Sequence, residues 1–271
     1  EKEITDDDIR NARHAYYGNI SYFDDWLGKI IQTLDETNLR ENTIIMVISD
    51  HGDMLGERGL WYKMVFFEYA SRIPMIISAP ERFSKQRISS NASLLDLLPT
   101  LIDLATPEGV SIPEFADHVD GRSLVPLMTG EAIEDADEAI GEMLGEGAIA
   151  PCMMIRRGQY KYIHSDPDPA QLYDLLEDPN ELSNLSGDKN LADIESGFEE
   201  EIRTRWNSEA LRQEIISDQK RRIKVFQSLS KGRQKSWDHQ YTREASKQFM
   251  RNHLDLNDLE RSTRYPPPQE S

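Results

Sequence analysis

Cysteine and long apolar runs are the two things this 271-residue sequence lacks most clearly. A single cysteine, Cys152, rules out an internal disulfide and favours a reducing compartment. No apolar run approaches the roughly 20 residues of a membrane-spanning helix. The chain also starts without an initiator Met and without the basic-then-apolar pattern of a secretory leader. The first two absences argue against a disulfide-rich domain and against a membrane-spanning helix, whereas the charged, abrupt start suggests that something upstream is missing.

Basic residues are also scarce, with 31 Lys and Arg against 49 Asp and Glu, giving a net charge of −18. Residues 1–150 hold 28 acidic and 12 basic groups, whereas residues 151–271 hold 21 and 19. A nucleic-acid-binding protein needs a basic surface to displace the counterions of phosphates, and neither half offers one. The hydrophobic content of 38% is still enough for a packed core.

The apolar pattern of the first 130 residues predicts an α/β fold. Thr5 followed by three acidic residues is typical of a helix start, and helical spacing continues to Leu34. Residues 43–48 and 72–78 are short apolar runs that we interpret as strands of a parallel sheet, buried on both faces. Residues 93–104 predict a helix that is kinked or restarted at Pro99. Such an order of elements is typical of an open α/β sheet.

The pattern changes after Gly130. Residues 153–164 predict two strands joined by a tight Arg-Gly turn, and residues 188–206 and 209–229 predict helices. We therefore expect three parts: an α/β domain over 1–130, a smaller antiparallel subdomain with helices over 131–234, and a polar tail over 235–271.

The loop directly after the first strand carries the strongest chemical signal. Asp50 and His51 stand where ligands bind in open α/β sheets, outside the carboxyl end of a strand. A carboxylate beside an imidazole suits a divalent metal, and Gly52 lets the backbone fold closely around it. Alternatively, Asp50 caps a turn and His51 is a surface residue. Lys63, between aromatic residues downstream, can supply positive charge to an anionic group held by such a metal.

At this point the sequence resembles the sulfatases, within the alkaline-phosphatase-like superfamily. Four ordered segments carry the resemblance: the Asp-His pair after a strand, the downstream lysine, residues 121–127 (Gly-Arg-Ser-Leu-Val-Pro-Leu), and residues 171–185 with Leu-Tyr-Asp-Leu, Asp-Pro-Asn-Glu and Asn-Leu. The resemblance implies that residues 1–130 are the C-terminal part of the sulfatase α/β sandwich.

Within that family the chain resembles the choline sulfatases over residues 50–63, 145–151 and 251–259. The resemblance implies hydrolysis of choline O-sulfate to choline and sulfate in the cytoplasm, by a homo-oligomer assembled through the C-terminal tail. It implies no nucleic-acid or membrane partner.

The same resemblance implies roles for individual residues. Asp50 and His51 are expected to bind the divalent metal, and Lys63 to bind a sulfate oxygen and act in catalysis. Calcium is the metal we expect, although manganese suits a histidine ligand better. A quaternary ammonium is recognised by carboxylates and aromatic faces, and the candidates for contact with choline are Glu142, Glu146 and Asp255.

The sequence lacks the family's nucleophile, a formylglycine made from Cys or Ser in a Cys/Ser-x-Pro-x-Arg motif. Cys152 is followed by two methionines and does not fit. Ser78 begins a matching Ser-Ala-Pro-Glu-Arg segment but lies downstream of the Asp-His pair, so we do not take it as the nucleophile. We expect the chain to be the C-terminal half of an enzyme about twice its size, inactive alone, with the formylglycine in the missing N-terminal part.

Two alternatives remain. A phosphonate monoester or phosphodiester hydrolase belongs to the same superfamily and also uses an Asp-His pair, although the choline-type tail argues against it. The second alternative is a non-catalytic interaction protein derived from half a sulfatase, which the missing nucleophile favours.

Overall fold

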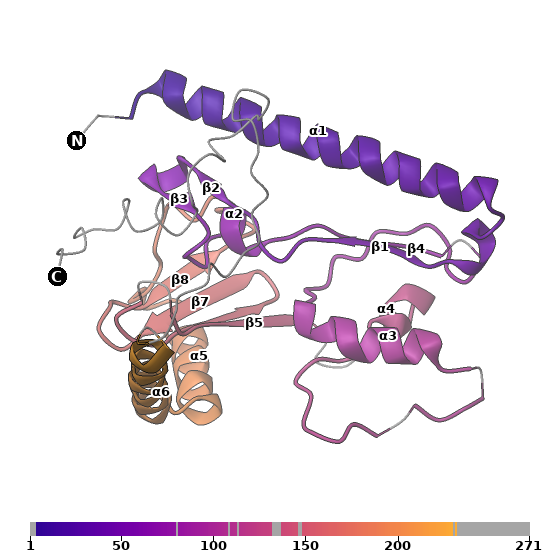
Figure 1. Ribbon diagram of the computed structural model, residues 1–271. Coiled ribbons are helices and arrows are strands. Elements are labelled where there is room, and N and C mark those ends of the chain that lie inside the picture. The colour runs from indigo at the N-terminus through magenta and orange to yellow at the C-terminus, as the bar shows by residue number, and fades with distance from the viewer. Residues whose placement is uncertain are drawn as a thin grey trace. The chain divides into compact units, whose positions relative to one another are not determined.

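The computed structural model describes residues 4–79, 81–107, 109–112, 114–131, 137–145, 148–229 and 231 (Figure 1). The chain divides into two compact units, Glu1–Ile216 and Ser217–Ser271. The described helices are α1 (Asp6–Glu36), α2 (Glu68–Ser71), α3 (Leu97–Ala105), α4 (Val125–Thr129), α5 (Ala192–Arg205) and α6 (Ser208–Leu229). The described strands are β1 (Ile45–Ile48), β2 (Met54–Leu55), β3 (Trp61–Tyr62), β4 (Met75–Ser78), β5 (Glu138–Met143), β6 (Cys152–Arg157), β7 (Tyr160–Ser165) and β8 (Gln171–Asp174).

Helix α1 begins where the sequence predicts. Thr5 is its N-cap, and the side chain of Asp8 closes a capping box by accepting from the backbone of Thr5. Three acidic residues then occupy the first turn, where the helix dipole favours negative charge. None of the 31 residues of α1 is buried, so its apolar stripe lies largely uncovered in this structure.

The sheet formed by β1 and β4 corrects one prediction. The two strands pair antiparallel, with Met46 opposite Ile77, and not in parallel as expected. A parallel neighbour requires a crossover of a dozen or more residues, usually a helix. The connection over residues 49–74 is long enough for a crossover, but its described elements are short, the hairpin β2–β3 and single helical turns, and the chain returns in the opposite direction. The pair is also not buried on both faces, because Ile76 is 59% exposed.

One face of the β1–β4 pair packs on α3 and α4, as Figure 1 shows. Leu104, Leu124 and Met128 are the buried centre of this contact. The helix predicted over 93–104 is present as a 3-10 turn over Leu94–Asp96 followed by α3. The break lies before Leu97 and not at Pro99, which occupies the first turn of α3, where a proline is tolerated. The segment 121–127 leads into α4 and includes its first residues.

The antiparallel subdomain predicted after Gly130 is present as a four-stranded sheet in the order β5-β6-β7-β8. The predicted hairpin is its centre, and Gly158 turns it with a φ of 55°. The helices predicted at 188–206 and 209–229 are α5 and α6. None of the described helices is long and apolar enough to cross a membrane.

The two faces of this sheet bury different partners. One face, with Met153, Ile155 and Leu172, packs against Phe198 and Ile202 of α5. The opposite face packs on the segment that follows β1, in a cluster made of Met54, Phe67, Ala70, Met154, Ile163 and Tyr173. The second face therefore connects the sheet to the loop that carries the candidate site. The domain boundaries near residues 130 and 234 stay predictions.

Candidate functional site

The candidate site begins at the carboxyl end of β1, as predicted. Ser49 donates from Oγ to the carbonyl oxygen of His51 at 2.7 Å, and the N–H of His51 donates to Asp50 Oδ1 at 3.0 Å. These two bonds turn the backbone sharply after the strand. The turn brings Asp50 Oδ2 to 3.3 Å from His51 Nε2. Asp50 therefore does hold the turn, as the structural alternative supposed, while its second oxygen faces the imidazole.

Gly52 is required at this turn because the backbone of α2 packs directly on it. Its N–H donates to the carbonyl oxygen of Ala70 at 2.8 Å. A Cβ atom at Gly52 would lie 2.1 Å from the carbonyl oxygen of Tyr69, which is far inside van der Waals contact. The glycine thus lets the loop dock against α2 without a side chain in between.

Lys63 and His51 meet although 12 positions separate them. Lys63 Nζ donates to His51 Nε2 at 2.8 Å, and His51 Nδ1 lies 2.8 Å from the carbonyl oxygen of Gly52. A carbonyl oxygen accepts only, so Nδ1 carries a proton. Nε2 lies beside both the Lys63 ammonium and the Asp50 carboxylate, and this is the ring nitrogen that is left to bind a metal.

The carboxylate of Asp50 is ionised and open to solvent. Its side chain is 81% exposed, whereas that of His51 is 32% exposed. Slight desolvation raises the pKa of Asp50. Two effects outweigh it and leave the pKa below its usual value: hydrogen bonds from the backbone of Asp50 and His51, and the nearby side chains of His51 and Lys63. Asp50, His51 and Lys63 therefore combine a carboxylate, an imidazole nitrogen and a cation within hydrogen-bond distance.

This donor set fits part of a divalent metal shell. A carboxylate oxygen and an imidazole nitrogen are both ligands that such metals accept. Within the described residues, no group of three or more His, Cys, Asp and Glu side chains is arranged to hold a metal ion. Asp50 and His51 can therefore supply two ligands, and a metal would need further ligands beyond that pair.

The choline-contact candidates fall elsewhere. Glu142 is exposed on β5, and its Oε1 accepts from Trp206 Nε1 at 2.5 Å. It lies on the face of the sheet that packs on α5, opposite to the face that contacts α2. Glu146 and Asp255 lie outside the described residues. The roles of all three stay predictions.

Neither residue considered for the nucleophile lies among the contacts of this loop. Ser78 ends β4, and its Oγ accepts from Arg40 Nη2 at 3.4 Å. Cys152 is half-buried at the start of β6, where burial and then the charge of Asp168 raise the pKa of its thiol to about 11. Cys152 is therefore a protonated, unreactive thiol at neutral pH.

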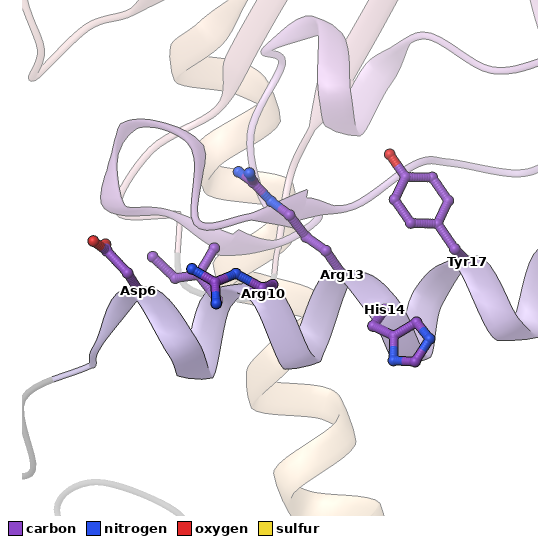
Figure 2. A pocket seen from close by; sticks show the side chains of 6 residues that line it. Asp6, Arg10, Arg13, His14 and Tyr17 are labelled. Atoms are coloured by element: carbon purple, nitrogen blue, oxygen red, sulfur yellow. The ribbon is translucent and has the colours of Figure 1, made fainter.

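A groove of about 670 Å³ lies along the first turns of α1. Figure 2 shows the side chains that line it, among them Arg10, Arg13 and His14. Arg13 also attaches the helix to the hairpin before Lys63, because its Nε donates to the carbonyl oxygen of Leu55 at 3.1 Å and its Nη2 to Glu57 at 2.7 Å. This groove shares no residue with the Asp50–His51–Lys63 set.

Sequence reasoning missed a buried ionic cluster behind the site. Lys161 is fully buried and pairs with Glu68 and Glu181. The only signal was a lysine within the apolar run of a strand, which is typical of a paired buried cation. Glu181 was noticed as part of a motif, but nothing in the sequence connects it to Glu68.

Three family profiles match successive parts of the chain. Residues 1–107 match the profile described as "Sulfatase", and residues 56–208 match "N-sulphoglucosamine sulphohydrolase, C-terminal". Residues 213–265 match "Choline sulfatase enzyme C terminal". The profiles together cover nearly the whole chain.

Curated relatives agree with the profile matches. The chain is 40% identical over 268 residues to the choline-sulfatase of Rhizobium meliloti (strain 1021), covering 97% of this chain and 51% of that protein. It is 36% identical over 194 residues to arylsulfatase K of Gallus gallus, covering 68% of this chain and 35% of that protein. The chain therefore spans about half the length of the first relative and about a third of the second.

Solved structures place the fold in the same group. The phosphonate monoester hydrolase of Agrobacterium radiobacter aligns with a TM-score of 0.65 and 29% identity, covering 79% of this chain and 43% of that one. A 2-O GAG sulfatase aligns with a TM-score of 0.64 and 26% identity, covering 74% and 44%. Because a sulfatase profile matches more than half of its residues, the chain belongs to the sulfatase family.

Proposed function

We propose that the protein to which this chain belongs hydrolyses the sulfate ester of choline O-sulfate, releasing choline and sulfate. The observation that carries the proposal is the Asp50–His51–Lys63 arrangement in a chain 40% identical to a choline-sulfatase. The match of residues 213–265 to the choline sulfatase C-terminal profile supports the substrate.

Each residue of the set has a role in this proposal. A divalent metal held by Asp50 and His51 would neutralise charge on the sulfate oxygens. The Lys63 ammonium, released from His51 Nε2, binds a sulfate oxygen and stabilises the negative charge that develops during hydrolysis. The bond from His51 Nδ1 to the Gly52 carbonyl oxygen would fix the orientation of the imidazole and leave Nε2 as the nitrogen that could bind the metal.

We further propose calcium as the metal, a formylglycine as the nucleophile, and the cytoplasm as the compartment. Members of the sulfatase superfamily generally use a divalent metal and a formylglycine. A single imidazole ligand leaves the remaining positions to oxygen atoms, which calcium prefers, and manganese would accept the same set. Because Cys152 and Ser78 do not suit the nucleophile, the 271-residue chain alone is expected to be inactive.

Choline specificity is assigned to carboxylates. A fixed quaternary ammonium offers no hydrogen-bond donor, so charge and aromatic faces must recognise it. We propose that the tail over 235–271 docks on a neighbouring subunit of a homo-oligomer and brings Asp255 to the ammonium, with Glu142 and Glu146 as further candidates. Deleting the tail in the complete protein should then raise KM for choline O-sulfate, spare hydrolysis of an uncharged aryl sulfate, and weaken the oligomer in sedimentation.

The test of the function is an assay of the complete protein. Release of sulfate from choline O-sulfate, abolished by Asp50→Ala together with the loss of bound metal, supports the proposal. Wild-type metal content in Asp50→Ala would contradict the assignment of the ligand. Absence of turnover for every ester would favour the non-catalytic alternative.

A phosphonate monoester hydrolase is the second candidate function, favoured by the structural alignment to such an enzyme at a TM-score of 0.65. The two functions differ in the charge of the substrate. Preference for an aryl phosphonate monoester over choline O-sulfate in the same assay would select this second candidate.

A further inference from the structure

A fully buried lysine on β7, Lys161, forms ion pairs with two carboxylates. Lys161 is 0% exposed. Its ammonium lies 2.6 Å from Glu68 Oε1, 2.8 Å from Glu181 Oε1 and 2.9 Å from the carbonyl oxygen of Phe66. An ammonium has three N–H donors, so these three acceptors satisfy all of them. The lysine is therefore held in one position in the interior.

The two carboxylates of this cluster are equally well satisfied. Glu181 accepts through Oε2 from the N–H of Glu68 at 2.7 Å, at the first position of α2. Glu68 Oε2 pairs with Arg156 Nη1 at 2.8 Å, on the strand opposite Lys161. Two cations and two anions thus balance in a buried space, and removing one leaves its partner unpaired.

The cluster is connected to the candidate site through α2. Lys161 and Glu181 hold the start of this one-turn helix, and its end receives the loop: the carbonyl oxygen of Ala70 accepts from Gly52 N–H at 2.8 Å. The carbonyl oxygen of Gly52 in turn accepts from His51 Nδ1 at 2.8 Å. An unbroken chain of contacts therefore runs from the buried lysine to the imidazole.

We propose that Lys161, Glu68 and Glu181 form a positioning cluster that holds α2 against Gly52 and thereby fixes His51 and Asp50. None of the three touches the imidazole or the Asp50 carboxylate, so they are positioning residues and not catalytic ones. The restraint on the loop stands on the contacts alone. Its use in metal binding rests on the proposed function.

The first test measures amide hydrogen exchange in the complete protein without added metal. Glu181→Gln keeps the shape of the side chain but removes its charge and one acceptor oxygen. We expect the exchange rate of the Gly52 N–H to rise at least about 10-fold more than that of the Ile155 N–H in the central strand β6. The reason is that α2, which accepts the Gly52 hydrogen bond, would open locally more often. Equal acceleration of both amides, or no change at Gly52, would overturn the proposal.

Glu138→Gln is the matched control. Glu138 pairs on β5 with Arg157 and with Arg205 at 2.9 Å, on the other face of the sheet, and has no contact with α2. Glu138→Gln should change the exchange rates of the Gly52 and Ile155 amides by the same factor. If Glu181→Gln does not fold, Arg156→Gln replaces it, because Arg156 is at the outer, 24% exposed side of the cluster. A selective rise at Gly52 is again expected, and its absence again overturns the proposal.

A second measurement separates this inference from the proposed function. In the complete protein, calorimetric titration with calcium should show affinity weakened about 10-fold by Glu181→Gln and unchanged by Glu138→Gln. If the protein proves to have no sulfatase activity, the exchange result is unaffected. If exchange at Gly52 does not respond, the positioning role fails whatever the activity.

Discussion

Lys63 supplies the positive charge of the Asp50–His51–Lys63 set. Lys63→Ala in the complete protein should lower kcat/KM for choline O-sulfate by about 10²-fold or more, since removing one group that stabilises developing negative charge costs about 3 kcal/mol. Lys63→Arg should restore little, because a planar guanidinium does not replace a compact ammonium. Steady-state kinetics of both variants measure this, and near-normal values for Lys63→Ala would remove the residue from the site.

Cys152 offers a residue-scale test that needs no activity. With a pKa of about 11, its thiol is almost wholly protonated at pH 8. Alkylation by iodoacetamide should therefore be at least about 10-fold slower in the folded chain than in urea, where the pKa returns to about 8.5. Mass spectrometry follows the reaction, and equal rates would show that the start of β6 is open in solution.

At the scale of elements, α2 depends on the ionised form of Glu68. Burial alone would raise the pKa of Glu68. The nearby Lys161 and Arg156 outweigh burial, so the net pKa lies below the ordinary value of 4.5. The stabilisation is therefore complete above pH 4.5 and is lost as the pH falls through the lower, folded-state pKa. The difference in free energy of unfolding between the chain and Glu68→Gln should shrink from pH 7 to pH 3, as urea titrations would show. A difference independent of pH would mean that Glu68 keeps the same pKa when unfolded.

The segment that precedes α4 packs closely at Gly121 on the 3-10 turn that precedes α3. A Cβ atom there would lie 1.9 Å from the carbonyl oxygen of Leu95, and the next residue donates from its N–H to Asp96 Oδ1 at 2.9 Å. Gly121→Ala should destabilise the chain by about 1–3 kcal/mol, as over-packing generally does. Gly145→Ala is the control, because open space surrounds that position. Similar melting temperatures for both variants would contradict the close approach.

The elements themselves could largely be predicted from the sequence, and the reasons are local. Thr5 and the acidic turn after it mark the start of α1, and the alternating apolar residues around Gly158 mark the hairpin. The direction of β4 could not be predicted, because an apolar run such as 72–78 reads the same in parallel and antiparallel pairs. The association of Lys63 with Asp50 and His51 was expected from its aromatic neighbours and from the resemblance to the sulfatases. The Lys161 cluster joins residues up to 113 positions apart and left no local pattern.

At the scale of the molecule, the first compact unit carries an unusual amount of exposed apolar surface. Large side chains of α1 are about half exposed or more, namely Tyr17, Ile20, Tyr22, Phe23, Trp26 and Ile30, with exposed fractions of 48–66%. Contiguous apolar surface of this kind marks interaction sites or a tendency to associate. The chain alone is therefore expected to bind the dye ANS and to associate as its concentration rises.

Fluorescence titration and sedimentation velocity measure these two effects. Replacing Phe23 and Trp26 by Ser and Gln should lower both dye binding and association, while the circular dichroism of α1 is retained. A monomer that binds no dye would mean that this surface is covered in solution.

The pairing of Lys161 also orders the steps by which the protein folds. The strands β6, β7 and β8 follow one another closely along the chain, so their hairpins can form early with little loss of loop entropy. Lys161 contacts Glu181, which is 20 positions away along the chain, and Phe66, which is 95 positions away. We therefore expect α2, and with it the loop of Asp50 and His51, to dock after the sheet has formed. Newly made molecules would pass through a stage in which the sheet protects its amides while residues 49–71 remain open to proteases.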